Sequence, residues 1–298
     1  MRFGFWPGPN SPWSELLDLA RHAEATGWDG IWYADHFMPN AEDTSGPTNE
    51  AWTSIAAIAA TVPRVRIGTL VTGNTYRHPA VLAKMAAGVD NISGGRLVLG
   101  LGSGWQENEH AAYGIHFSTI GGRLSRLEEA CQVIKSLFEN DKTTFAGKHY
   151  QLTEAPLAPK PVQTPLPLMI GGGGEQRTLR ITAKYADEWN VWGTPEVLRQ
   201  KMAVLDRHCA EVGRDPKAIQ RSAVAMLVLT DDESVIERSR ASGRPVIAGD
   251  AEAVRAVIRE YQDAGVDEVI IPDFNMGGAE RKKATMDAFI TDVAPAFR

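Results

Sequence analysis

An acid and a histidine stand side by side directly after a short apolar run, since Asp35 and His36 follow residues 30–33. Histidine side chains titrate near pH 6.5, which suits them to donate a proton or to hydrogen-bond a developing charge. The histidines that fall on helical patterns instead are His22, His110 and His208. We therefore expect His36 to be the catalytic residue, with Asp35 orienting or tuning it. A polar loop after a strand is the simpler alternative.

Four consecutive glycines join an apolar run to a helical pattern in the segment GGGGEQRT, residues 171–178. Backbone N–H groups in a glycine turn beside a helix N-terminus suit a phosphate. The residues predicted to form this site are Gly171, Gly172, Gly173, Gly174, Glu175 and Thr178. Glu175 argues slightly against an anion. No Gly-Lys-Ser/Thr sequence is present, so the segment is not a P-loop.

A second glycine loop follows residues 97–101, where Gly100, Gly102 and Gly104 alternate in GLGSGW. Glycine allows a ligand to approach the backbone closely, and a tight strand-to-helix turn is the alternative. Trp105 stands where a dinucleotide fingerprint has its third glycine, so this is not the fingerprint of a Rossmann fold.

Aromatic side chains gather at the ends of the predicted strands. Trp6, Trp32 and Trp192 lie at or just before such ends, and Asn275 follows the last strand. Any single tryptophan could simply pack under a loop, but together they predict an aromatic pocket for a flat or apolar substrate.

Composition excludes several classes of protein. The net charge is −6 without a basic run, so neither nucleic acid nor an anionic membrane is an expected partner. No apolar run approaches the length of about 20 residues that a membrane span needs, and no signal peptide is visible. Cys131 and Cys209 fall on helical patterns without a C-x-x-C motif, which predicts reduced thiols in a cytoplasmic protein.

The sequence gives little support for a metal site or for the active site of a glycosidase. No second cluster of histidine and acid accompanies Asp35 and His36, so we expect no metal site. Glu50 could be the acid of a barrel glycosidase, but a second carboxylate cannot be placed. Glu50 is expected to open a helix instead.

Short apolar strands alternate with amphipathic helices along the whole chain. The predicted strands are residues 3–6, 30–33, 65–71, 97–101, 168–170, 188–191, 222–229 and 269–271. Eight such units predict an α/β fold, a (β/α)₈ TIM barrel, as a single domain over residues 1–298. An insertion at roughly 141–166, part hairpin and part extended, is expected to lie over the barrel mouth. Barrel enzymes place their sites at the carboxyl ends of strands, where the residues above fall.

Residues 74–114 hold four motifs in one order: T-Y-R-H-P-A-V-L-A-K, D-x-I-S-G-G-R, L-G-x-G-x-G-W and E-x-x-x-Y-G. In this combination and spacing the chain resembles the luciferase-like monooxygenase superfamily, and most closely its branch of deazaflavin-dependent oxidoreductases. The resemblance extends from Phe3 to about Asn275.

The resemblance implies roles for residues at the strand ends. In relatives, an acid–histidine pair after strand two faces the tricyclic ring; here it is Asp35 and His36. A bulge with a non-proline cis peptide supports the ring after strand three, which corresponds to residues 70–74 and includes Val71, Thr72, Gly73 and Asn74. The cofactor phosphate is expected on Ser103, Gly104 and Trp105, and on residues 171–178.

One departure from the family pattern bears on the cofactor. Ser103 stands where luciferases that use flavin mononucleotide (FMN) place an arginine on the flavin phosphate, which favours coenzyme F420. The resemblance thus implies hydride transfer between F420 and an unidentified organic substrate. A missing lysine cluster near the insertion argues against a sugar-phosphate dehydrogenase. The alternatives are an FMN-dependent monooxygenase using oxygen and a non-catalytic cofactor-binding barrel. Relatives also imply a homodimer.

Overall fold

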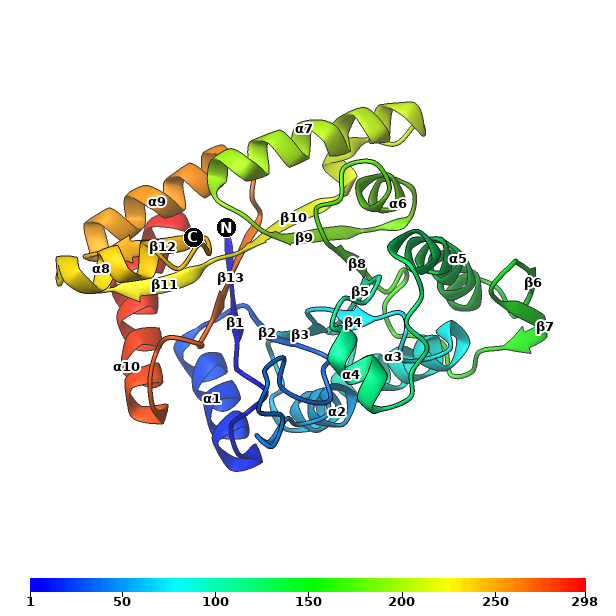
Figure 1. The fold of residues 1–298 in the computed structure, drawn as a ribbon, viewed down its shortest axis with the longest axis horizontal. Coiled ribbons are helices and arrows are strands. Elements are labelled where there is room, and N and C mark those ends of the chain that lie inside the picture. Colours follow the sequence, from blue (N-terminus) through cyan, green and yellow to red (C-terminus); the bar gives the residue numbers. More distant parts are fainter.

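The computed structural model describes all residues, 1–298, and its parallel strands close into a barrel (Figure 1). The barrel strands, in chain order, are β1 (Arg2–Trp6), β2 (Gly30–Tyr33), β3 (Arg66–Thr69), β5 (Leu97–Gly102), β8 (Leu168–Gly171), β9 (Glu188–Trp192), β10 (Gln220–Val224) and β13 (Glu268–Pro272). The sheet closes because β1 pairs with β13 and β3 pairs with β5. The predicted (β/α)₈ barrel is confirmed.

Helices cover the outside of the barrel. They are α1 (Trp13–Thr26), α2 (Ala51–Thr61), α3 (Pro79–Ser93), α5 (Ile120–Glu139), α6 (Thr178–Tyr185), α7 (Pro195–Glu211), α9 (Ala251–Asp263) and α10 (Ala279–Ala288). Side-chain caps fix several of their starts. Glu50 accepts a hydrogen bond from the Thr53 N–H at the start of α2, as expected, and Thr119 caps α5 in the same way. No helix combines the length and apolar character that a membrane crossing needs.

The apolar core has two layers. The larger one, of 63 buried residues, lies between the barrel and its helices, and a smaller cluster of 8 fills the barrel interior. Trp32 belongs to the interior cluster and is fully buried. A Cβ atom at Gly4 or Gly68 would lie 2.5 Å from the Trp32 indole, so the neighbouring strands carry glycine to make room for it.

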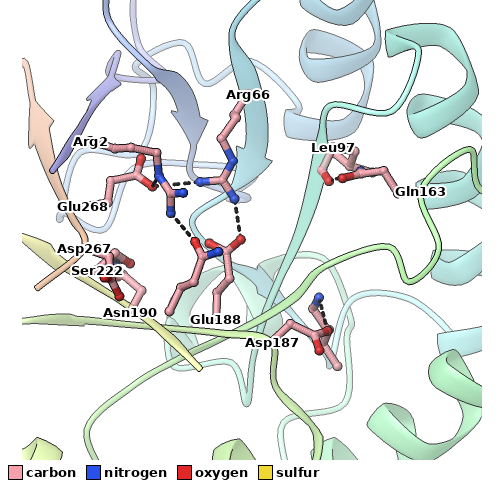
Figure 2. A network of polar contacts seen from close by, with 12 residues as sticks. Arg2, Arg66, Leu97, Gln163, Asp187, Glu188, Asn190, Ser222, Asp267 and Glu268 are labelled. Carbon is pink, nitrogen blue, oxygen red and sulfur yellow. Dashed lines mark hydrogen bonds and ion pairs between the residues drawn. The ribbon is translucent and has the colours of Figure 1, made fainter. Parts of the chain in front are cut away.

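Charged residues at the first positions of several strands close the end of the barrel that the amino ends of the strands form. Figure 2 shows Arg66 directed at Glu188 and Glu268, with Arg2 beside them. Arg66 Nη1 donates to Glu268 Oε2 at 2.9 Å, and its Nη2 pairs with Glu188. The Trp32 indole N–H donates to Glu268 Oε1 at 2.8 Å. Buried charges are costly unless they are paired, and these charges pair with one another. The network closes the end of the barrel at the amino ends of the strands, so it does not occupy the end at their carboxyl ends.

The seventh predicted strand, residues 222–229, is wrong as a single element. It divides into β10 and β11 (Met226–Leu229), and β11 leaves the barrel to pair in parallel with β12 (Val246–Gly249). Helix α8 (Glu233–Arg240) connects β11 to β12. The sequence does not show this division, because both strands bury their side chains and together they form one apolar run. We refer to residues 226–249 as the accessory unit.

The expectation that the insertion lies over the barrel mouth is wrong. It lies outside the barrel beside α5 (Figure 1). It contains the antiparallel hairpin of β6 (Lys142–Ala146) and β7 (Gln151–Pro156), followed by an extended segment. Glu129 on α5 accepts backbone N–H groups at the hairpin turn, and Gln163 bonds to Asp90 on α3. These attachments to helices hold the insertion away from the mouth.

Candidate functional site

A cavity of about 960 Å³ opens at the carboxyl ends of the strands. Of the residues predicted from the sequence, those that line it are Trp6, Asp35, His36, Val71, Gly73, Ser103, Gly104, Trp105, Gly171, Gly172 and Trp192. They come from segments scattered between residues 6 and 192. The parallel strands therefore bring the predicted residues into one cavity, because all their carboxyl ends lie on the same side of the barrel.

Two predicted pocket residues do not reach this cavity. Trp32 lies inside the barrel with its indole bonded to Glu268, below the cavity. Asn275 donates from Nδ2 to the Leu227 carbonyl at 2.9 Å, so it fastens β11 to the loop after β13. The expectation that these two side chains line the pocket is wrong, because each is used for packing or for joining segments.

Residues 72 and 74 of the bulge also point away from the cavity. Thr72 Oγ1 accepts from the Trp52 indole at 3.0 Å, and Asn74 Nδ2 donates to the Tyr150 hydroxyl at 3.1 Å. Both side chains are buried behind the wall. They hold β4 (Thr72–Gly73) against α2 and the hairpin, while their neighbours Val71 and Gly73 face the cavity.

His36 pairs with a carboxylate, but the partner is Glu109 rather than Asp35. His36 Nδ1 lies 2.8 Å from Glu109 Oε1, and the Phe37 N–H donates to Glu109 Oε2 at 2.8 Å. The Tyr76 hydroxyl also donates to Oε1. Glu109 is on the short helix α4 (Glu107–Ala112) and is fully buried. The imidazole is thus held by Nδ1, with its Nε2 free to face the cavity.

Asp35 belongs to a different ion pair. It accepts from Arg77 Nη1 at 2.6 Å and from Nη2 at 3.3 Å, and Arg77 also reaches Glu50 at 2.7 Å. The expected contact of Asp35 with His36 is therefore not formed. Asp35 instead fixes the segment before His36 through Arg77, which lies in the loop preceding α3.

Burial and hydrogen bonding act in opposite directions on these carboxylates. Burial raises the pKa of Asp35 despite the adjacent Arg77. At Glu109, burial also acts to raise the pKa, but the hydrogen bonds from His36, Phe37 and Tyr76 outweigh it, so the pKa lies below its usual range. Burial and the neighbouring Glu109 raise the pKa of Tyr76, which keeps its hydroxyl a donor. Glu109 is therefore an ionised acceptor at neutral pH.

The peptide bond between Leu70 and Val71 is cis, within the segment where the resemblance places one. Val71 then fills a hollow left by glycines of two neighbouring strands. Cβ atoms at Gly102 and Gly171 would lie 2.8 Å from Val71 side-chain carbons. At Gly100 a Cβ would lie 1.9 Å from the Thr69 carbonyl oxygen. Gly100 and Gly102 are thus required by the chain's own packing within β5, which neither the expected approach of a ligand nor a tight turn describes.

Two loops beside each other present backbone N–H groups without backbone acceptors. They are residues 103–106, after β5, and residues 173–176, after β8. β5 and β8 are neighbouring strands. The Gly172 N–H, in contrast, donates to the Asn190 carbonyl at 2.9 Å. Glu175 is neutralised by Lys201, with 2.7 Å between Oε1 and Nζ, and Thr178 begins α6. Unpaired amides beside a helix start suit an anion.

A model of the luciferase-like monooxygenase family matches residues 1–247, which is most of the chain. The chain belongs to the luciferase-like monooxygenase family.

Curated relatives of this luciferase-like protein are F420-dependent enzymes by name. An F420-dependent glucose-6-phosphate dehydrogenase from Kineococcus radiotolerans is 29% identical, over 95% of this chain and 93% of its own length. The enzyme of the same name from Amycolatopsis mediterranei is 37% identical, but over 58% of this chain and 50% of its own length. An F420-dependent hydroxymycolic acid dehydrogenase from Mycobacterium tuberculosis is 29% identical over 74% of this chain and 60% of its own length.

Solved structures share the fold of the luciferase-like protein. An F420-dependent secondary alcohol dehydrogenase, in complex with an F420-acetone adduct, superposes with a TM-score of 0.86 at 22% identity, over 100% of this chain and 99% of that one. The F420-dependent tetrahydromethanopterin reductase of Methanopyrus kandleri gives 0.84 at 21% identity, with the same coverage.

Several site residues of the luciferase-like protein were missed at the level of sequence. Glu109, Tyr76 and Arg77 all lie within the quoted motifs E-x-x-x-Y-G and T-Y-R-H, but nothing local assigns them a partner. Arg244 and Phe274 also line the cavity, and Arg244 comes from the accessory unit. For Glu109, Tyr76 and Arg77 the available sequence signal was their place in these motifs. No sequence signal pointed to Arg244.

Proposed function

We propose that the protein is an oxidoreductase that transfers a hydride between coenzyme F420 and a small organic substrate. The observation that carries this proposal is the cavity itself, which is lined by a histidine on a buried carboxylate and by the loop of unpaired amides after β5. The second loop of unpaired amides, residues 173–176, follows Gly172 at the edge of the cavity. The names of the curated relatives support F420 as the cofactor.

The residues present fit such a cofactor. A volume of about 960 Å³ accommodates a tricyclic ring together with a substrate. Ser103, Gly104 and Trp105, with residues 173–176, would hold the phosphate through backbone N–H groups. Val71 would support the ring, since it faces the cavity and is fixed by the glycines behind it. Bound there, F420 would supply a carbon centre that donates or accepts a hydride.

The chain's own contribution to the reaction is the movement of a proton. In the proposed mechanism His36 donates or removes the proton that accompanies hydride transfer at the substrate. Glu109 holds the ring through Nδ1 and stabilises positive charge on it, so that Nε2 can exchange a proton with the substrate. The pair of Asp35 and Arg77 keeps the backbone beside His36 in place.

Titration of the purified protein with F420 and with flavin mononucleotide, followed by fluorescence, tests the cofactor. We expect saturable binding of F420 and much weaker binding of flavin mononucleotide, because Ser103 offers the phosphate no positive charge. Tighter binding of the flavin, with oxygen uptake when it is reduced, would instead support a monooxygenase. Binding without turnover of any alcohol or carbonyl compound would support a non-catalytic barrel.

We further propose that residues 1–298 act as one domain and that two copies form a homodimer in the cytoplasm. Pairing of β1 with β13 supports a single domain, because the barrel needs both ends of the chain. An apolar face on α3 supports the dimer; Val81 and Ile92 on it are 54% and 52% exposed. Two buried, unbridged cysteines support a reducing compartment.

A further inference from the structure

The accessory unit brings one positive charge to the barrel mouth. Arg244 lies between α8 and β12 and is the only lysine or arginine that lines the cavity. Its place is fixed by the backbone around it, since the Met226 N–H donates to the Pro245 carbonyl at 2.9 Å. The Asn275 bond to Leu227 ties the same unit to the loop after β13.

Aromatic rings, rather than a carboxylate, hold the Arg244 side chain. Its guanidinium carbon lies 5.6 Å from the centre of the Trp192 ring and 5.9 Å from that of Phe274. Its backbone N–H donates to Ser242 Oγ, but its guanidinium makes no ion pair. Stacking of a guanidinium on aromatic faces leaves its N–H edge free for a planar anion.

The wall below Arg244 is apolar and aromatic. Trp6 contacts Trp192 with 5.9 Å between ring centres, and it contacts Phe274 at 5.0 Å. Trp6 and Trp192 are the last residues of β1 and β9, and Phe274 follows β13, whereas the unpaired amides follow β5 and β8. The cavity therefore has two places suited to an anion, one at the amides of residues 103–106 and one at Arg244 beside the aromatic rings.

We propose that Arg244 is a specificity-determining residue that binds a carboxylate on the substrate, while the substrate's apolar body packs against Trp6, Trp192 and Phe274. The proposal rests on the proposed function, because it assigns the amide loops to the cofactor and this wall to the substrate. A single guanidinium matches the two oxygens of one carboxylate through paired N–H donors. A group of greater charge would find no second cation in the cavity.

Calorimetric titration of the F420-loaded protein with 2-naphthoate and with its neutral amide, 2-naphthamide, tests the assignment. The parent is expected to bind the acid about tenfold more tightly than the amide, the range of a hydrogen bond to a charged group. Arg244→Gln should abolish this preference, and Arg244→Lys should keep part of it. Arg240→Gln, at the end of α8 and outside the cavity, is the matched control and should behave as the parent.

Three results would overturn the proposal. The parent could show no preference for the acid, which includes the absence of saturable binding at millimolar concentration. Arg244→Gln could keep the preference. Alternatively, Arg244→Gln could weaken F420 binding as much as it weakens naphthoate binding, which would assign the arginine to the cofactor. Binding of F420 by the parent is measured first, so that a failure of the proposed function is seen separately. If F420 does not bind, the two naphthalene compounds are compared on the protein without cofactor.

Discussion

At the scale of single residues, the site depends on which carboxylate holds the histidine. His36 and Glu109 are 73 positions apart in the sequence and are joined by a contact of 2.8 Å. Asp35, although adjacent in the chain, points to Arg77. Asp35 and His36 lie in the irregular segment after β2, where adjacency in the chain does not bring two side chains together.

Substitution of His36 by alanine should reduce turnover roughly 10²–10⁴-fold, the usual contribution of a positioned proton donor or base. F420 affinity should change by less than about tenfold, because the amide loops are untouched. Steady-state kinetics and fluorescence titration measure the two quantities. His116→Ala, at an exposed loop position, and His78→Ala serve as controls, although His78 also caps α3. Full turnover in His36→Ala, with loss of turnover in one of the controls, would show that another histidine carries out the proton transfer.

Replacement of Glu109 by glutamine gives a prediction for acid stability. The folded protein holds the pKa of Glu109 below its ordinary value, so the ionised form stabilises the fold above the ordinary pKa of about 4.3. This contribution is lost as the pH falls through the lowered pKa. The free energy of unfolding of the parent should therefore decrease relative to Glu109→Gln below about pH 4.3. Urea unfolding at a series of pH values checks this, and a constant difference would contradict it.

At the scale of elements, two neighbouring strands deliver the loops that are proposed to hold the phosphate. Their glycines serve the fold as well as a ligand, since Gly171 accommodates Val71 and Gly172 has a positive φ of 127°. Substitution of Gly172 by valine would strain the backbone whether or not a phosphate binds there. Side-chain hydroxyls at the same loops therefore make a cleaner test than the glycines.

Thr178→Val should weaken F420 binding about tenfold, because it removes a hydroxyl donor at the start of α6 while keeping the size of the side chain. Ser103→Ala is expected to act in the same direction. Fluorescence titration measures both. Thr285→Val on α10, whose hydroxyl bonds only to the Arg281 carbonyl, is the control. Unchanged affinity in both loop variants would place the phosphate elsewhere.

At the scale of the whole molecule, one outer face of the barrel lacks a cover. Val81 and Ile92 lie on it together with Gly88, where even an added Cβ atom would meet nothing within 4 Å. Exposed apolar side chains arranged along one face of a helix are typical of interfaces between copies of a chain.

The proposed homodimer should therefore sediment at about twice the chain mass of 32.5 kDa. Val81→Glu combined with Ile92→Glu should convert it to a monomer of unchanged fold, because both residues are exposed in the single chain and a buried charge disfavours association. Ile120→Glu, an exposed position on α5 that is 67% accessible, should leave the dimer intact. Analytical ultracentrifugation distinguishes these cases, and a parent that sediments as a single chain at micromolar concentration would refute the dimer.

The sequence by itself determined the class of fold and the end of the barrel at which the candidate site lies. Apolar runs and helical periodicity are local signals, so the barrel strands could be placed within a few residues, and Glu50 could be assigned to a helix start. Parallel strands share one direction, so whatever follows them must gather at one mouth. For that reason His36, Ser103 and Gly171 were predicted to lie around one cavity without any knowledge of their contacts.

The tertiary structure alone decided which side chains meet. Trp32 points into the barrel and Trp192 into the cavity, although each lies within one residue of a strand end. The depth of a side chain depends on the register and tilt of all its neighbours. The division of residues 222–229 into β10 and β11 depends on β12, which competes for the second half of that run. Arg244 reaches the mouth only through this pairing. Contacts of this kind join segments far apart in the chain, and no local pattern of residues encodes them.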